Sequence, residues 1–462
     1  MAVAGLKGRK IALFGANSAT VALIKFLVRR GAVVRLIDTR PVEVIREGFA
    51  EHIDFDRIEL ACGPVEPTAF TEIEMVVVPA GMPLDARVLE HVRTLGIPVV
   101  SELEFVSQHT QTPIIAIAGT NGKTTTALLL TAILEKSGKS VFSNALRPLA
   151  ESLIQTKPLD YIVAACSSFQ LDGISSFKPA MVLLLNLTED HLNHYPNFET
   201  YVAANREVLR NADKSTRIIL NASDPHLIAL APALAGQTQV FAQQPLPEDF
   251  EGAWATRTHM VIRNQAGKDA TNFILNQLRL RGTHNKENLM AASLAALQLG
   301  ASAEDITHVI ESFRGPAHRV EFVKRVNSVA FYNDASGANV GALLRTLQAF
   351  QEPIILISGG RDKNADYTPL IPHIRQRVKN LILVGEAKEK MNRAIGDYTE
   401  TFLVGTLEEA VLLAYQKSRS GDVILMSPGC DPTDVFSSHE EKGEHFKKLV
   451  NMISIPRRPN VF

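Results

Sequence analysis

The chain has 462 residues, of which 46% are hydrophobic and 21% charged, and its 48 Lys and Arg nearly balance its 49 Asp and Glu. That length predicts roughly three globular domains. The balanced charge argues against a broad surface of one sign, such as nucleic-acid-binding and membrane-binding proteins use. Ligands should therefore bind at local sites.

Cysteine content and hydropathy predict a soluble cytoplasmic protein with no membrane insertion. The three cysteines are too few and too far apart for a disulfide framework. The apolar run that comes nearest to a membrane span, at 180–185, is far shorter than the ~20 residues such a span needs. The apolar run at 11–14 is too short for the core of a signal peptide.

The first hundred residues alternate short apolar runs with helical patterns, which predicts a small Rossmann-like unit. A helix is expected at 19–30, and strands are expected at 10–14, 33–37, 75–78 and 98–100. The first turn, 15–20, lacks the second and third glycines of GxGxxG, so no dinucleotide site is predicted there. Asp38 ends the second strand and is placed to accept from a ribose or a base, although a capped turn also explains it.

A glycine-bracketed loop at 119–126 reads GTNGKTTT and joins the apolar run 113–118 to a helical pattern at 127–136. A strand, such a loop and a helix direct backbone N–H groups to one point, which stabilises a phosphate chain. Lys123 would reach the β- and γ-phosphates, and the hydroxyl of Thr124 or Thr125 would bind Mg²⁺. The usual first glycine would fall at position 117, so this is a shortened variant. The alternative is a tight turn with a solvated lysine.

The strand predicted at 181–186 ends close to acidic residues and a histidine. In open α/β sheets ligands bind at the carboxyl ends of strands, so Glu189, Asp190 and His191 are candidates for metal binding or acid–base chemistry. A helix capped by Thr188, with acidic residues in its first turn, is the alternative.

A helix is predicted from Gly282 to Gly300, and its start is rich in Asn and His, which suit either a purine edge or a capping network. The segment 315–319 resembles a hinge. Beyond it, strands predicted at 329–332, 353–358, 380–384 and 422–426 form a third α/β unit.

Seven motifs in order resemble the Mur ligases: GTNGKTTT, SSFQLD (167–172), NLTEDH (186–191), HNKEN (284–288), PAHR (316–319), YND (332–334) and GGRDKNADY (359–367). The sequence is most similar to the members that add D-glutamate to UDP-N-acetylmuramoyl-L-alanine. The resemblance implies an α/β, three-domain Mur ligase architecture. Its parts would be a UDP-sugar-binding Rossmann-like domain (1–101), a central P-loop ATPase domain (102–314) and a C-terminal Rossmann-like, amino-acid-binding domain (315–462).

The resemblance also implies the chemistry of peptidoglycan biosynthesis, with ATP and Mg²⁺ as cofactors and a monomeric protein. ATP would phosphorylate the substrate carboxylate, and the amine of D-glutamate would attack the acyl phosphate. Such a reaction depends mainly on positioning and on neutralising charge.

The family assigns these roles residue by residue. Lys123 and His191 would be catalytic, and Thr124 and His191 would support metal ions. The nucleotide would be bound by Gly119, Thr120, Asn121, Gly122, Lys123, Thr124, Thr125, Asn288, Arg319 and Asp334. The other substrates would be bound by Asp38, Thr39, Arg40, Asn144, Ser167 and Lys363.

Several positions depart from the family pattern, among them Ala338, where the family has a threonine, and the corner at 143–147. Ala165 stands where the family has a glutamate that binds magnesium, and Asn205 stands where it has a carbamylated lysine. Ser336, Pro432 and His439 replace residues of the expected amino-acid pocket. Alanine cannot ligate a metal, and asparagine cannot form a carbamate.

Two alternatives to an active D-glutamate ligase therefore stay open. One is a Mur ligase homologue with a different acceptor, and the other is a non-catalytic, nucleotide-binding homologue. Neighbouring carboxylates, Glu189, Asp190 and Glu207, are candidates to compensate for the lost groups.

Overall fold

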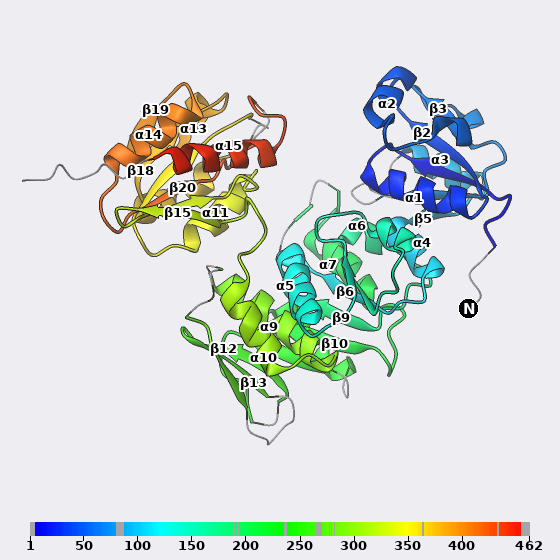
Figure 1. Ribbon diagram of the computed structural model, residues 1–462, viewed down its shortest axis with the longest axis horizontal. Coiled ribbons are helices and arrows are strands. Elements are labelled where there is room, and N and C mark those ends of the chain that lie inside the picture. The colour runs from blue at the N-terminus through cyan, green and yellow to red at the C-terminus, as the bar shows by residue number, and fades with distance from the viewer. Residues whose placement is uncertain are drawn as a thin grey trace, which may run out of the picture. The chain divides into compact units, whose positions relative to one another are not determined.

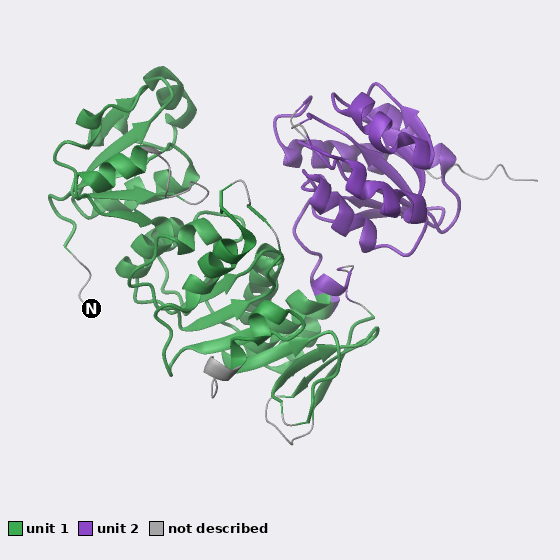
Figure 2. Cartoon of the chain, turned by 180° about the vertical axis from the view of Figure 1, so that it is seen from behind, with its two compact units in different colours: residues 1–276, 286–310 green, residues 277–285, 311–462 purple. Residues whose placement is uncertain are grey.

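The computed structural model forms two compact units, residues 1–276 with 286–310, and residues 277–285 with 311–462 (Figure 2). The structure describes residues 5–79, 87–188, 190–191, 194–234, 238–248, 250–263, 270–276, 278, 280, 282–362, 365–431 and 434–453. Both units consist of helices packed on mainly parallel sheets (Figure 1).

The first sheet of unit 1 is fully parallel, in the order β3-β2-β1-β4-β5. Its strands are β1 (Lys10–Phe14), β2 (Val33–Asp38), β3 (Glu59–Cys62), β4 (Met75–Val78) and β5 (Val99–Ser101). The helices are α1 (Ser18–Arg29), α2 (Val42–Phe49), α3 (Arg87–Thr94) and α4 (Glu102–His109), with 3₁₀ turns η1 (Phe55–Arg57) and η2 (Pro67–Phe70). Asn17 and Thr20 form a reciprocal capping box that starts α1 directly after the first turn.

The second sheet of unit 1 has the order β14-β13-β12-β11-β10-β9-β6-β8-β7, and β12, β13 and β14 pair antiparallel at one end. Its strands are β6 (Ile114–Ala118), β7 (Val141–Ser143), β8 (Tyr161–Ala165), β9 (Met181–Leu184), β10 (Arg217–Asn221), β11 (Thr238–Ala242), β12 (Gly252–Ala255), β13 (His259–Arg263) and β14 (Thr271–Ile274). The central strands read almost entirely Val, Ile, Leu and Ala, as expected where helices cover both faces.

Helices of several lengths accompany this sheet. They are α5 (Lys123–Lys136), α6 (Ser168–Leu171), α7 (Phe198–Arg206), α8 (Pro225–Ile228), α9 (Thr283–Gln298) and α10 (Ala303–Ser312), with 3₁₀ turns η3 (Leu149–Ile154), η4 (Glu207–Leu209) and η5 (Ala231–Leu234).

One hydrophobic core runs through both sheets of unit 1, and α4 is central to it. Phe105 of α4 packs edge-on against Phe26 of α1 and stacks on His109. The buried carboxylate of Glu104 accepts hydrogen bonds from the backbone N–H groups of Ser175, Ser176 and Phe177. This shared core explains why the first two expected domains form one compact unit.

Unit 2 contains a six-stranded sheet in the order β15-β16-β20-β17-β18-β19, parallel except for the β15–β16 pair. Its strands are β15 (Glu321–Val326), β16 (Val329–Asn333), β17 (Ile354–Ser358), β18 (Val378–Leu383), β19 (Glu400–Leu403) and β20 (Val423–Met426). The helices are α11 (Val340–Gln348), α12 (Ile371–Arg377), α13 (Lys388–Ile395), α14 (Leu407–Lys417) and α15 (His439–Met452), with 3₁₀ turns η6 (Thr368–Leu370) and η7 (Gly396–Tyr398). Two separate apolar clusters accompany the sheet.

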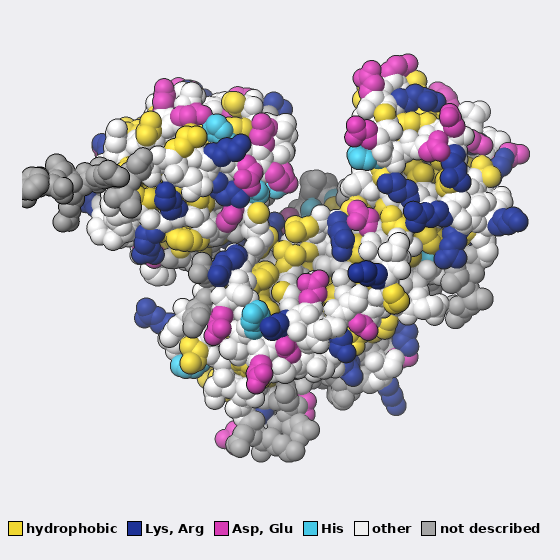
Figure 3. Space-filling model, in the orientation of Figure 1, with side chains coloured by type: hydrophobic (Ala, Val, Ile, Leu, Met, Phe, Trp, Pro, Cys, Tyr) yellow, Lys and Arg dark blue, Asp and Glu magenta, His cyan; other side chains and the backbone are white. Residues whose placement is uncertain are grey.

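The predicted α/β class with parallel sheets is confirmed. In the part of the chain that the structure describes, no helix is long and apolar enough to span a bilayer. Positive and negative side chains intermingle on the visible surface, in keeping with the balanced composition (Figure 3).

Candidate active site

The predicted phosphate loop connects β6 to α5, which begins at Lys123. Gly119 and Gly122 have φ angles of +118° and +92°, a region that side chains disfavour. A Cβ at Gly119 would lie 2.7 Å from the Asn186 carbonyl oxygen, and one at Gly122 would lie 2.2 Å from the Asn288 Oδ1. Both glycines are therefore required, and the loop lies directly against buried Asn288.

The Lys123 ammonium lies over its own loop. Its Nζ donates to the carbonyl oxygens of Gly119 at 2.6 Å and Thr120 at 2.9 Å. The first N–H groups of a helix have no intrahelical acceptor and give this end a partial positive charge. The ammonium and the start of α5 together make a site suited to a polyphosphate.

The loop is joined to the segment that follows β9. Backbone N–H groups of Thr120 and Asn121 donate to the Asn186 carbonyl oxygen (2.8 Å) and Oδ1 (2.9 Å), and the Asn186 Nδ2 donates to the Asn121 carbonyl oxygen (2.9 Å). The Thr188 N–H donates to the Thr120 Oγ1 at 3.0 Å. An anion would therefore meet the amides at the start of α5 rather than those of Thr120 and Asn121.

His191 follows this segment and has a left-handed backbone, with φ of +53°. Its half-exposed ring packs edge-on against Phe169 and lies near Tyr201, at centroid distances of 4.9 and 6.2 Å. The His191 Nε2 lies 3.8 Å from the Asp190 Oδ2. Because Tyr201 also bonds to Thr120, the structure brings His191 and the phosphate loop to the same aromatic side chain. Glu189 lies outside the described residues.

Ala165, the first departure from the family pattern, pairs with Ile117 just before the phosphate loop. The Asn144 side chain binds its backbone twice: the Ala165 N–H donates to Oδ1 at 2.6 Å, and Nδ2 donates to the Ala165 carbonyl oxygen at 3.1 Å. Ser167 caps α6 through a reciprocal capping box with Gln170. Two expected substrate-binding residues, Asn144 and Ser167, thus support the end of β8.

Asn205, the second departure, is 1% exposed on α7. Its Nδ2 donates to the Tyr201 carbonyl oxygen at 3.0 Å, whereas its Oδ1 is buried with no partner among the described residues. Within those same residues, no three His, Cys, Asp or Glu side chains converge as in a protein-built metal cage.

In the N-terminal sheet, Asp38 stabilises a turn. Its carboxylate accepts from the Ala16 N–H at 2.7 Å and forms two side-chain hydrogen bonds with Arg40, at 2.9 and 2.7 Å. Burial raises the pKa of Asp38, but the hydrogen bonds from Arg40 and Ala16 outweigh it and hold the pKa below its ordinary value. The carboxylate therefore stays ionised and fixes the backbone beside Thr39.

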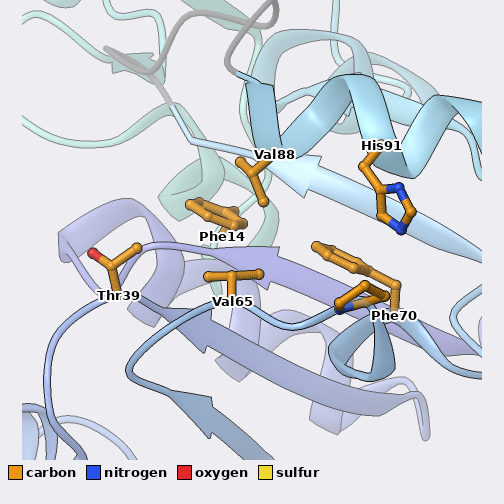
Figure 4. Close-up of a pocket in the computed structure, with 7 residues that line it drawn as sticks. Phe14, Thr39, Val65, Phe70, Val88 and His91 are labelled. Carbon is orange, nitrogen blue, oxygen red and sulfur yellow. The ribbon is translucent and has the colours of Figure 1, made fainter.

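A mainly apolar pocket of about 540 Å³ opens beside Thr39. Figure 4 shows the Thr39 hydroxyl and the His91 ring on opposite sides of a group of apolar side chains. The pocket is lined by Phe14, Thr39, Val65, Pro67, Phe70, Val88 and His91. Sequence reasoning identified Thr39 alone among them. Of the other lining residues, Phe14 could have been anticipated, because it ends a strand that the sequence predicts.

In unit 2, exposed Arg319 lies between two residues with left-handed backbones, His318 (φ +61°) and Val320 (φ +48°). Asp334 is 2% exposed, and its oxygens accept from the Val320 N–H at 3.2 Å, Thr346 Oγ1 at 2.8 Å and Ser427 Oγ at 2.7 Å. A ribose contact would need one of these donors to be exchanged. Lys363, the expected carboxylate ligand, lies outside the described residues.

Burial raises the pKa of Asp334 to about 6, even though the hydrogen bonds from Ser427 and Thr346 act to lower it. The carboxylate is therefore less stable in its charged form than an exposed aspartate.

Three family models match this chain. They are described as Mur ligase MurD-like, N-terminal domain (residues 9–101), Mur ligase middle domain (117–296) and Mur ligase, glutamate ligase domain (318–430). The chain is 39% identical to the UDP-N-acetylmuramoylalanine–D-glutamate ligase of Bdellovibrio bacteriovorus, over 96% of the chain and 98% of that relative. It is 37% identical to the enzyme of the same name from Geotalea uraniireducens, over 97% and 98%.

Solved structures agree at the level of fold. The UDP-N-acetylmuramate-alanine ligase MurC of Thermotoga maritima matches with a TM-score of 0.60 and 16% identity, over 96% of this chain and 99% of that one. A pseudomurein peptide ligase type C from Methanothermus fervidus matches with a TM-score of 0.58 and 16% identity, over 97% and 100%. The phosphate loop, the order of the motifs and these matches agree, and the chain belongs to the Mur ligase family of ATP-dependent ligases.

Proposed function

We propose that this protein is the ATP-dependent ligase that joins D-glutamate to UDP-N-acetylmuramoyl-L-alanine in peptidoglycan biosynthesis. The observation that carries the proposal is a glycine-bracketed phosphate loop at Gly119–Thr125 in a chain that is similar to D-glutamate ligases over nearly its whole length. We further propose that it acts as a monomer in the cytoplasm.

The reaction has two steps. A carboxylate oxygen of the substrate attacks the γ-phosphorus of ATP, giving an acyl phosphate and ADP. The D-glutamate amine then attacks the acyl carbon, loses a proton, and inorganic phosphate leaves. The Lys123 ammonium and the start of α5 stabilise the charge of the phosphates during the first step.

Magnesium would fit at the start of α5, where threonine hydroxyls offer oxygen atoms as ligands. Mg²⁺ prefers oxygen ligands and usually binds through one or two protein groups together with substrate phosphates. Thr124 is partly exposed at the start of α5, whereas Thr125 is buried, so Thr124 is the better placed hydroxyl. Bound there with ATP, the ion would neutralise phosphate charge, and we propose His191 as support for a second ion.

The uridine end of the substrate fits the pocket beside Thr39. Its apolar walls suit the faces of a planar base, and the Thr39 hydroxyl suits a polar edge. Asp38 and Arg40 hold the turn that presents Thr39. We propose that Asn144 and Ser167 lie nearer the sugar and the peptide end.

For the remaining ligands, the proposals rest on the family motifs. Asn288 would contact the adenine, and Arg319 and Asp334 the ribose. Lys363 would bind the carboxylate of the incoming amino acid.

The test is phosphate release with ATP, Mg²⁺, UDP-N-acetylmuramoyl-L-alanine and a panel of D- and L-amino acids. We expect release with D-glutamate and none without the UDP-linked substrate. Turnover only with another amino acid would reassign the acceptor. Tight ATP binding without turnover under any condition would contradict the ligase proposal.

A further inference from the structure

Tyr201 is a buried aromatic residue of α7 whose hydroxyl touches the phosphate loop. The side chain is 2% exposed, and its hydroxyl bonds to the Thr120 Oγ1 at 3.0 Å. Tyr201 and Thr120 lie 81 positions apart in the sequence. The contact is therefore a tertiary link made by two side chains.

The Thr120 hydroxyl has all its hydrogen-bonding capacity in use. It donates its proton to the Thr188 carbonyl oxygen at 3.1 Å and accepts from the Thr188 N–H at 3.0 Å. Because the Thr120 hydroxyl donates its single proton to Thr188, it can only accept a hydrogen bond from the Tyr201 hydroxyl, which is therefore the donor. One oxygen atom thus fixes the loop to Thr188 and to α7.

Two further features hold Tyr201 in this role. The Asn205 Nδ2 donates to its carbonyl oxygen one turn along α7. Burial raises the pKa of the Tyr201 hydroxyl above its ordinary value, so the group keeps its proton and stays a donor at neutral pH.

We propose that Tyr201 is a positioning residue for the nucleotide, which acts by donating to Thr120 and so holding the phosphate loop in the shape that receives the phosphates. Lys123 donates to the Thr120 carbonyl oxygen, so a shift of Thr120 moves the partner of the ammonium itself. The inference rests on the proposed use of ATP but adds a residue that acts on the nucleotide through Thr120.

Tyr195 provides a matched control in the same aromatic cluster. It is 5% exposed, and its ring centroid lies 5.5 Å from that of Tyr201. Its hydroxyl donates to Asp172 at 2.7 Å rather than to the phosphate loop. Replacing either tyrosine by phenylalanine removes the hydroxyl and its hydrogen bond and leaves the ring packing intact, but only Tyr201→Phe affects Thr120.

The experiment measures the Kd of the full-length protein for a non-hydrolysable ATP analogue by calorimetry, together with thermal unfolding and KM values. We expect Tyr201→Phe to weaken analogue binding roughly fivefold, the loss of one hydrogen bond, with the KM for D-glutamate unchanged. Tyr195→Phe should lower the unfolding temperature comparably and leave the analogue Kd unchanged.

A double-mutant cycle tests the route through Thr120. If Tyr201 acts through this hydroxyl, Thr120→Val with Tyr201→Phe binds the analogue no more weakly than Thr120→Val alone. Full additivity, an unchanged Kd in Tyr201→Phe, or equal losses in both tyrosine variants would each overturn the proposal. Analogue binding without phosphate release in the wild type would contradict the ligase function and leave this test intact.

Discussion

Asn144 and Asp38 show how single side chains at the candidate site are fixed before any ligand arrives. Asn144 binds both backbone groups of Ala165, and Asp38 binds Arg40 and the Ala16 N–H. Each side chain has little rotational freedom left to lose on binding. A ligand that met them would bind to ordered groups, which lowers the entropic cost of binding.

Lys123→Ala should abolish measurable ATP binding, because the triphosphate would lose the cation that lies over the loop. Isothermal titration with the ATP analogue measures this. The control is Lys136→Ala, at the opposite end of the same helix, which removes an exposed lysine and should bind like the wild type. Equal affinity in Lys123→Ala and the wild type would contradict the assigned role.

Ala165→Glu should lower the Mg²⁺ concentration needed for half-maximal phosphate release, by roughly tenfold. The new carboxylate would extend from a backbone position held by Asn144, beside the strand that enters the phosphate loop. Ala165→Gln, similar in size but neutral, is the matched control. If the two variants respond alike, or if Glu lowers activity with the fold intact, another group already supplies the ligand.

At the level of elements, strongly patterned segments were predicted well. The strand before the phosphate loop and the helix after it were expected from an apolar run, two glycines and a helical pattern, and they appear as β6 and α5. The antiparallel strands β12, β13 and β14 were not predicted, because they are short, and β13 and β14 mix polar with apolar residues. The hydrogen bond between Tyr201 and Thr120 was not predicted either, because a contact between residues so far apart in the sequence leaves no local pattern.

Asp334 links three elements of unit 2: it follows β16, and it binds Thr346 of α11 and Ser427 after β20. Its raised pKa means that the folded state binds the proton more tightly than the unfolded state does. The contribution of this bound proton to the free energy of unfolding is therefore complete below the ordinary pKa of 3.8, and it is lost as the pH rises through about 6.

Asp334→Asn should consequently flatten the pH dependence of stability. Between about pH 5 and about pH 7.5 the wild type should lose about 1.4 kcal/mol more of its unfolding free energy than the variant, since one pH unit below the pKa corresponds to that amount. Urea unfolding of both proteins at the two pH values measures the difference. Parallel curves would mean that the carboxylate titrates with an ordinary pKa.

At the scale of the whole molecule, the sequence predicted three α/β parts, and each has its own sheet. It did not predict that the first two share one core. That core depends on α4. The Phe105 ring packs edge-on against Phe26, and the Glu104 carboxylate accepts hydrogen bonds from the three backbone N–H groups of 175–177. Boundaries between domains are drawn from linker composition, whereas cohesion depends on side chains that meet only after folding.

Two units with separate cores should unfold in two calorimetric transitions rather than one. The phosphate loop and Asn288 belong to unit 1, so a bound ATP analogue should raise the transition of that unit. At an analogue concentration near one hundred times Kd, the added stability is about 2.7 kcal/mol. Lys123→Ala should remove this shift, and Leu356→Ala, in the core of unit 2, identifies the other transition. A single transition in the absence of nucleotide would show instead that the two units unfold cooperatively.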